Sequence, residues 1–245
     1  MRYTAAVICL VLTACVPSPM GRTTSISAAQ GLQSAIIAEE AAFMAATRAE
    51  GLMPAFAQRA AKDAIMFLPE PARIADRLAT EKWAGVVSWA PALIVSSSDG
   101  TMGLSTGPSN WVAGGQSYPG YYITIWERQP DGSLRFVFDS SADLPADLYA
   151  GRSENMELIA AEKGSVSLEI SEASLDVELA RADFAEAVPY HPSARLLQDG
   201  KAPIIGPGPA DSLLEQGEHR STLARSMARS GDLAWTYGRI VKPGS

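Results

Sequence analysis

Apolar side chains near the start of the chain recur at the spacing of an α-helix. Ile36 and Ile37 are followed seven positions later by Phe43 and Met44, so all four share one helical face. We expect this helix to span residues 28–50, because a glycine follows it directly. A proline soon afterwards suits the first turn of a second, short helix.

Beyond about residue 60 the pattern becomes that of β-strands separated by turns. A strand over residues 64–68 and a Pro-Glu-Pro turn precede a helix expected over residues 72–83. Four further strands are expected over residues 86–95, 101–105, 121–128 and 133–139. Pro130-Asp131-Gly132 supplies the turn between the last two. Helices followed by an antiparallel meander predict an α+β fold.

One phrase of the sequence returns near its other end. Ser97-Ser98-Asp99 lies 133 positions before Ser230-Gly231-Asp232, and Gly107 lies 131 positions before Gly238. A period of this length predicts a duplicated domain rather than a solenoid. Chance similarity between two turn-rich phrases is the alternative.

The duplication divides the chain into five parts. These are a signal peptide (1–14), a tether (15–27), a complete domain (28–139), a connector (140–170) and a partial second copy (171–245). The partial copy lacks two closing strands, and each large side chain they would bury contributes about 1.5–3 kcal/mol. We therefore expect it to pack on the first domain or to borrow strands from a neighbour, unless the sequence is truncated. A short helix is expected within the connector, near Leu158.

The amino terminus predicts export. A basic start and an apolar run over residues 4–12, too short to span a bilayer, indicate a signal peptide. Leu12-Thr13-Ala14-Cys15 resembles the lipobox of bacterial lipoproteins, which implies lipidation of Cys15; a plain secretory signal is the alternative. Val16 stands where lipoproteins retained in the inner membrane often carry Asp, so the resemblance favours the periplasmic face of the outer membrane.

The composition of the chain excludes several classes of partner and site. The chain has a formal net charge of -7 and lacks a basic cluster, which excludes nucleic acid as a partner. Both cysteines lie within the first fifteen residues, so neither a disulfide nor a thiolate metal site is expected in the mature chain. His191 and His219 each lack a second histidine at metal-ligand spacing. We therefore expect neither a metal nor a cofactor.

The segment GYYITIWERQPDGSLRFVFD, residues 120–139, together with the order of elements resembles the nuclear transport factor 2-like superfamily. The similarity is greatest to its small bacterial domains grouped with polyketide cyclase (SnoaL-like) and ketosteroid isomerase. It implies a cone-shaped, cystatin-like roll in which a strongly bent antiparallel sheet wraps around the N-terminal helices. The mouth of such a cone is often a pocket, although this fold hosts enzymes, binding modules and assembly domains alike.

The resemblance indicates where ligand-binding residues would lie. Alternate residues of a strand share one face, so Tyr122, Thr124 and Trp126 point the same way. The predicted pocket wall consists of Trp89, Tyr122, Thr124 and Trp126. Packing of Trp126 in the core is the alternative. Trp111, in an expected loop over residues 107–120, is the predicted lid or partner contact; a tolerated long hairpin is the alternative for this segment.

Enzymes resembling ketosteroid isomerase need a carboxylate base and a hydrogen-bond donor for the developing oxyanion. Asp63, Asp139 and Tyr122 have these chemical types. Each carboxylate also has a structural interpretation, Asp63 as a cap or turn residue and Asp139 as a strand end in solvent. A structure with both carboxylates facing bulk water would argue against catalysis.

These patterns favour a lipid-anchored envelope protein with a noncatalytic binding role, holding a small apolar ligand in the cone. The rival hypothesis is an isomerase-, cyclase- or dehydratase-like enzyme that uses a pocket carboxylate. A third is an assembly module that forms a homodimer through the open face of its sheet.

Overall fold

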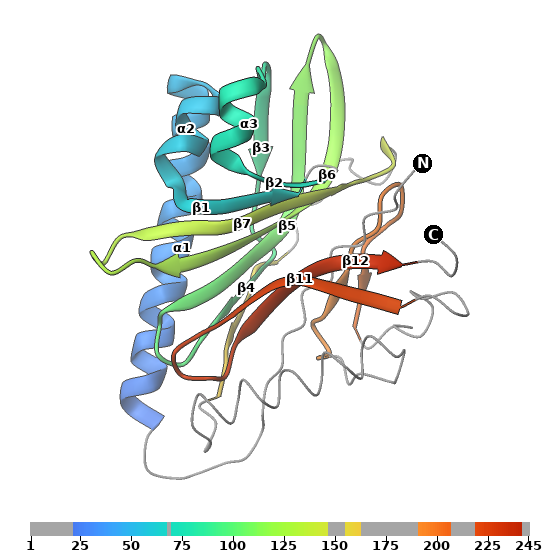
Figure 1. The fold of residues 1–245 in the computed structure, drawn as a ribbon. Helices are drawn as coiled ribbons and strands as arrows, with labels where there is room; N and C mark the ends of the chain where they lie inside the picture. Colours follow the sequence, from blue (N-terminus) through green and yellow to red (C-terminus); the bar gives the residue numbers. More distant parts are fainter. Residues whose placement is uncertain (1–21, 68–69, 147–154, 163–190, 207–218, 242–245) are drawn as a thin grey trace.

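The computed structural model describes residues 22–67, 70–146, 155–162, 191–206 and 219–241 (Figure 1). The predicted signal peptide and most of the tether lie outside these ranges. The helices are α1 (Arg22–Glu50), α2 (Leu52–Arg59) and α3 (Ile74–Thr80). Within the described ranges, no helix combines the length and apolarity needed to cross a bilayer.

The helices follow the predicted order, with changed boundaries. α1 begins at Arg22 and ends at Glu50, and Pro54 lies in the first turn of α2 as expected. α3 is shorter than the predicted helix because the chain on its N-terminal side, Pro71–Arg73, pairs as a strand, while Glu81 after it is extended.

Eight strands form one curved sheet in the order β2-β1-β7-β6-β5-β4-β8, with β3 pairing to β5 beside β4. Their bounds are β1 (Ala60–Phe67), β2 (Pro71–Arg73), β3 (Val86–Trp89), β4 (Leu93–Ser96), β5 (Met102–Ala113), β6 (Gln116–Arg128), β7 (Leu134–Asp143) and β8 (Glu157–Ala160). Pairing is antiparallel except for β1 with β7 and β4 with β8. β8 takes the place of the short helix expected in the connector, because it satisfies the free edge of β4.

The inner face of this sheet wraps around the helices. Ile36 and Phe43 of α1 belong to one buried cluster with Trp126 of β6 and Phe136 of β7. The rings of Phe43 and Phe136 stack at 6.0 Å between centroids. The predicted α+β roll, in which the ribbon of the last two strands shelters the N-terminal helices, is therefore confirmed.

The prediction of one continuous strand after α3 was wrong. The strand expected over residues 86–95 is divided into β3 and β4, because the chain breaks at Pro91 and both halves pair with β5. The backbone at this break lies directly against Gly107. A Cβ atom on Gly107 would lie 2.0 Å from the carbonyl oxygen of Ala90. Glycine is therefore required there by close backbone contact.

The segment over residues 107–120 is not a loop but a long hairpin, which was the alternative interpretation of its sequence. Its residues belong to β5 and β6, which continue their pairing to Ala113 and Gln116 around a two-residue turn. Gly114 and Gly115 form that turn with φ of 58° and 78°, the left-handed conformation that tight hairpin turns need.

A C-terminal hairpin covers part of the outer face of the sheet. It consists of β11 (His219–Met227) and β12 (Ala234–Val241), and a smaller hairpin precedes it as β9 (Arg195–Leu196) and β10 (Ile204–Ile205). Trp235 and Leu233 pack in one cluster with Ile125 and Phe138 of the main sheet. The homodimer hypothesis assumed an open sheet face, whereas this hairpin covers part of the outer face.

The repeated phrase forms two turns that touch each other. One connects β4 to β5 and the other connects β11 to β12, and in each the serine hydroxyl donates to the aspartate two residues on. The backbone N–H of Ser98 donates to Asp232 at 3.1 Å. The helix expected at the start of the second copy lies outside the described residues, so the duplication remains a prediction.

Candidate functional site

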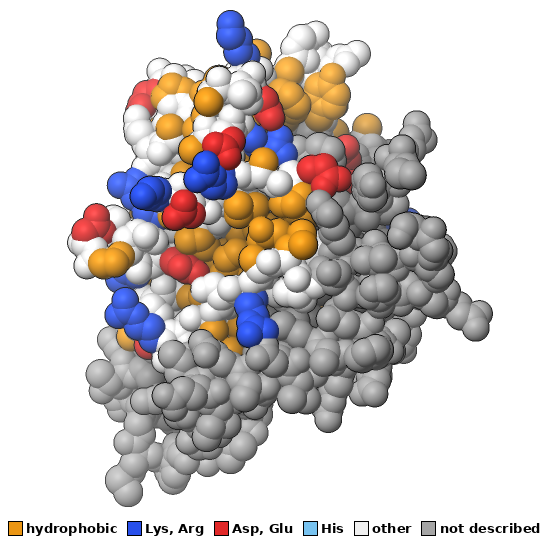
Figure 2. Space-filling view, viewed as in Figure 1, with side chains coloured by type: hydrophobic (Ala, Val, Ile, Leu, Met, Phe, Trp, Pro, Cys, Tyr) orange, Lys and Arg blue, Asp and Glu red, His pale blue; other side chains and the backbone are white. Residues whose placement is uncertain are grey.

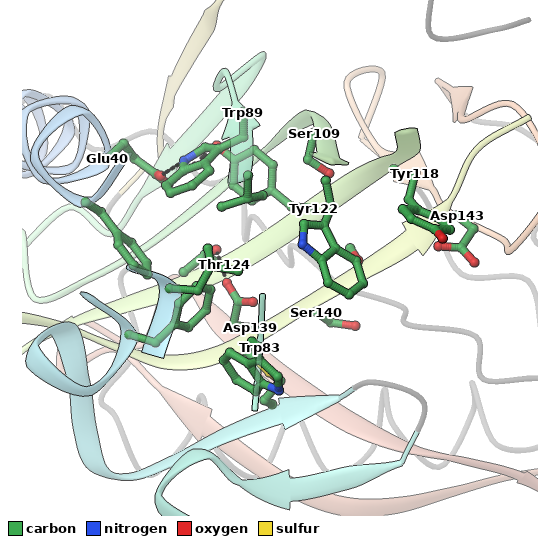
Figure 3. A pocket seen from close by; sticks show the side chains of 18 residues that line it. Glu40, Trp83, Trp89, Ser109, Tyr118, Tyr122, Thr124, Asp139, Ser140 and Asp143 are labelled. Atoms are coloured by element: carbon green, nitrogen blue, oxygen red, sulfur yellow. Dashed lines mark hydrogen bonds between the residues drawn. The ribbon is translucent and has the colours of Figure 1, made fainter. Parts of the chain in front are cut away.

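A cavity of about 220 Å³ lies between the helices and the inner face of the sheet (Figure 3). Its apolar wall includes Phe43, Leu52, Phe56, Met66, Trp83 and Trp89. An apolar cavity of about 150 Å³ is known to hold benzene, so this one has room for a bicyclic molecule. A mainly apolar and aromatic lining with a few polar groups is typical of small-ligand pockets.

The carboxyl group of Asp139 points into this apolar space (Figure 3). It accepts a hydrogen bond from the hydroxyl of Thr124, its cross-strand partner, at 2.7 Å. The pKa of Asp139 is raised to about 7, chiefly because the group is removed from bulk water. The hydrogen bond from Thr124 lowers this pKa, and the nearby charge of Glu40 raises it. The carboxyl group of Asp139 therefore changes between its protonated and ionised forms near neutral pH.

A β-bulge aims Asp139 at the cavity. Trp126 pairs with Phe136 and Ile125 pairs with Phe138, so Val137 is an extra residue in β7. An extra residue interrupts the alternation of side chains between the two faces. Phe136 accordingly packs among the helices, Phe138 packs on the outer face, and Asp139 faces inward with Thr124.

A second carboxylate, Glu40 of α1, lies buried at the back of the cavity (Figure 3). The indole N–H of Trp89 donates to its Oε2, and the hydroxyls of Ser105 and Tyr122 donate to its Oε1, Tyr122 at 3.4 Å. Trp126 in turn donates to Ser105 at 2.9 Å. Four side chains from three strands thus hold one helical glutamate in place.

The electrostatics of this group keep Tyr122 neutral. Burial raises the pKa of Glu40, while the hydrogen bonds from Ser105, Trp89 and Tyr122 lower it. Burial, and then the charge of Glu40, raise the pKa of Tyr122 well above its usual value. At neutral pH Tyr122 is therefore a hydrogen-bond donor beside the carboxyl group of Asp139.

The structure brings most of the predicted site residues together. Trp89, Tyr122, Thr124 and Asp139 all line the cavity. Trp126 does not line the cavity. Its side chain is fully buried, and its ring packs edge-on against Phe136 with 6.2 Å between ring centroids.

Asp63 lies apart from this group. Its side chain is 76% exposed and faces Arg73 at 3.9 Å, so of the two predicted carboxylates only Asp139 reaches the cavity. Trp111 lies at the cavity mouth on β5 rather than in a loop, and Tyr118 lines the same mouth from β6.

Glu40 was not among the residues predicted from the sequence, although a signal was present. It lies four residues after Ile36 and three before Phe43, on the face that these apolar residues define. A charged residue on the buried face of a helix needs partners there, which marks it as structural or functional.

Metal ligation finds no support in the described ranges, where no group of three His, Cys, Asp or Glu side chains could hold an ion. Nδ1 of His191 instead accepts the backbone N–H of Ser193 at 3.1 Å.

Comparison with solved structures returned nuclear transport factor 2-like and ketosteroid isomerase-like proteins, the group that the sequence resembles. A candidate ketosteroid isomerase of Parabacteroides distasonis is 15% identical over 45% of this chain and 86% of its own, with a TM-score of 0.37. A nuclear transport factor 2-like protein of unknown function from Pseudomonas putida is 13% identical over 52% and 97%, with a TM-score of 0.36.

A ketosteroid isomerase-like protein of Erwinia carotovora is 14% identical over 44% of this chain and 94% of its own, with a TM-score of 0.32. No protein-family model and no curated protein matched the chain. Each of the three structures is thus similar to about half of this chain.

Proposed function

We propose that the cavity binds a small, largely apolar molecule with a carbonyl oxygen and that Asp139 moves a proton on it. The observation that carries this proposal is a carboxyl group with a pKa of about 7 in an apolar cavity. A general base works best when its pKa lies near the working pH. Asp139 meets that condition.

In the proposed step, the Asp139 carboxylate removes a proton from the carbon next to the carbonyl. The electron pair of the broken C–H bond moves toward the carbonyl and leaves an enolate, whose oxygen accepts a hydrogen bond from Tyr122. The 3.4 Å contact of Tyr122 with Glu40 is long, so the hydroxyl can turn toward a ligand. Return of the proton to the same carbon gives exchange, and return to a conjugated carbon gives an isomer.

The test uses 2-tetralone, a bicyclic ketone that matches the cavity in size. NMR in D₂O follows exchange of its α-protons with wild-type protein, Asp139→Asn and Asp63→Asn. We expect acceleration by the wild type, equal acceleration by the exposed-site variant Asp63→Asn, and its loss in Asp139→Asn. Equal rates with Asp139→Asn and wild type would show that Asp139 is not the base.

A noncatalytic carrier is the second candidate, favoured by the aromatic wall and by the hydrogen bonds that already occupy both oxygens of Glu40. It predicts binding of an apolar ligand without proton exchange. Native mass spectrometry of the purified protein would detect a retained ligand, and that ligand, tested for α-exchange, would separate the two candidates.

We further propose, from the lipobox-like sequence, that Cys15 anchors the protein in the bacterial envelope. Metabolic labelling with an alkyne-bearing fatty acid is expected to label the wild type and not Cys15→Ser. Labelling that survives this substitution would refute the anchor.

A further inference from the structure

The mouth of the cavity lies on a projecting arm. We call this the mouth arm: β3 (residues 86–89) and the ends of β5 and β6 around their turn (residues 108–120). In Figure 1 the β5–β6 turn stands above the body of the molecule, and Figure 2 shows apolar side chains gathered at that end. The exposed apolar residues of the arm are Val86 (51%), Trp111 (40%), Val112 (41%) and Tyr118 (45%).

The mouth arm is apolar on both faces. Trp111 and Tyr118 are cross-strand partners, lie 5.5 Å apart between ring centroids, and line the cavity. Val86 and Val112 are also partners, one residue out of phase, so they point to the opposite face. A protein partner docked on one face would leave the other pair in water. An environment that surrounds the tip would cover both.

Charge on the arm fits a lipid environment. The chain has a net charge of -7, yet residues 100–126 contain no charged side chain. The polar atoms of the two aromatic residues already have partners: Trp111 Nε1 donates to the carbonyl of Ala84 at 2.9 Å, and the Tyr118 hydroxyl donates to Gln116 at 2.8 Å. Removing these rings from water therefore leaves no ring donor unpaired. Trp and Tyr are also the residues that favour the bilayer interface.

We propose that the tip of the mouth arm enters the headgroup region of a lipid bilayer and that the cavity exchanges its apolar ligand there. Trp111 and Tyr118 belong both to the exposed tip and to the cavity lining, so an apolar molecule can pass from lipid to cavity along these rings. The bilayer contact is independent of Cys15 and of proton transfer by Asp139. Only the ligand exchange rests on the proposed function.

Quenching of tryptophan fluorescence by brominated lipid tests the contact directly. The full chain is mixed with vesicles of phosphatidylcholine brominated on its acyl chains, and emission is compared with that on unbrominated vesicles. This comparison reports depth of the indole however the chain is held to the vesicle. We expect quenching in the wild type, its loss in Trp111→Phe, and its retention in Trp235→Phe, which removes an indole of the C-terminal hairpin.

A second pair of variants changes the surface and keeps the reporter. Val112→Asp places a charge at the tip and should abolish the quenching of Trp111. Leu158→Asp, at a site on β8 that is 48% exposed against 41% for Val112, should leave it intact. Absence of quenching in the wild type, or equal quenching in Trp111→Phe, would overturn the proposal. A Trp111 emission shift that depends on protein concentration without vesicles, and no quenching with them, would indicate a second copy as the occupant instead.

Discussion

Asp139 links the stability of the fold to pH. Its pKa is 3.8 in an ordinary setting and about 7 in the folded protein, so between these values the folded state binds the proton more tightly than the unfolded chain. The contribution of this group to stability is therefore complete below pH 3.8 and is lost as pH rises through 7. Its size is at most about 4 kcal/mol, since one pKa unit corresponds to about 1.4 kcal/mol.

Asp139→Asn should remove this dependence, because an amide does not ionise. The difference in unfolding free energy between the variant and the wild type is therefore expected to shift in favour of the variant from pH 4 to pH 8. Urea unfolding at both pH values measures this difference. The exposed Asp63→Asn serves as the control and should follow the wild type. A wild-type-like pH profile in Asp139→Asn would contradict the link.

The proton affinity of Asp139 also depends on Glu40. The charge of Glu40 raises the pKa of Asp139, so Glu40→Gln, which keeps the shape of the side chain, should lower it. ¹³C NMR of the Asp139 carboxyl group would follow its titration. The neighbouring Glu39→Gln, which breaks an ion pair with Arg59 outside the cavity, should leave the midpoint unchanged. An unchanged midpoint in Glu40→Gln would show that Asp139 does not sense this charge.

At the scale of elements, local patterns predicted what local forces decide. The ribbon of β6 and β7 follows from alternating side chains and the turn at residues 130–132, and both were recognised. The break at Pro91 and the extension of β5 through Gly107 were not, because they depend on pairing between distant segments. The bulge at Val137 has the same origin, so the sequence predicted the chemical type of Asp139 but not its direction.

Two glycine substitutions separate close contact from conformational freedom. Gly107→Ala should destabilise the protein by about 3 kcal/mol, because its methyl group meets the carbonyl of Ala90 at 2.0 Å. Gly31→Ala, on α1 with open space around it, should stabilise by about 0.5–1 kcal/mol. Thermal unfolding of both variants checks the signs. A neutral Gly107→Ala would mean that the chain yields at Ala90.

At the scale of the molecule, the C-terminal hairpin acts as a brace on the strand that carries Asp139. Phe138 lies 5.5 Å from Trp235 and 5.8 Å from Tyr237 between ring centroids. Glu127 of β6 accepts from Trp235 at 3.3 Å and from Ser226 at 3.1 Å. The sequence predicted that the C-terminal part could not stand alone, and packing on the first domain was one of the alternatives. It predicted neither the face that the hairpin covers nor these partners, because no local pattern encodes them.

Trp235→Ala should release this brace. Loss of a buried tryptophan costs about 3–5 kcal/mol, and we expect the hairpin to become sensitive to limited proteolysis before the rest of the domain. Leu223→Ala, at a 45% exposed position of the same hairpin, is the matched control. Equal proteolysis of the two variants would show that the hairpin is held by other contacts.

The extra residue in β7 makes the direction of Asp139 depend on the pairing register of one strand. Deleting Val137 would leave both neighbouring directions unchanged, because Phe138 already lies opposite Ile125 and Asp139 already lies opposite Thr124. If Val137 instead took a regular place opposite Ile125, Phe138 would turn inward and Asp139 would turn outward, to the face that Trp235 covers. A slip of one residue in pairing therefore separates a cavity lined by an acid from one lined by a phenyl ring, without any change of sequence.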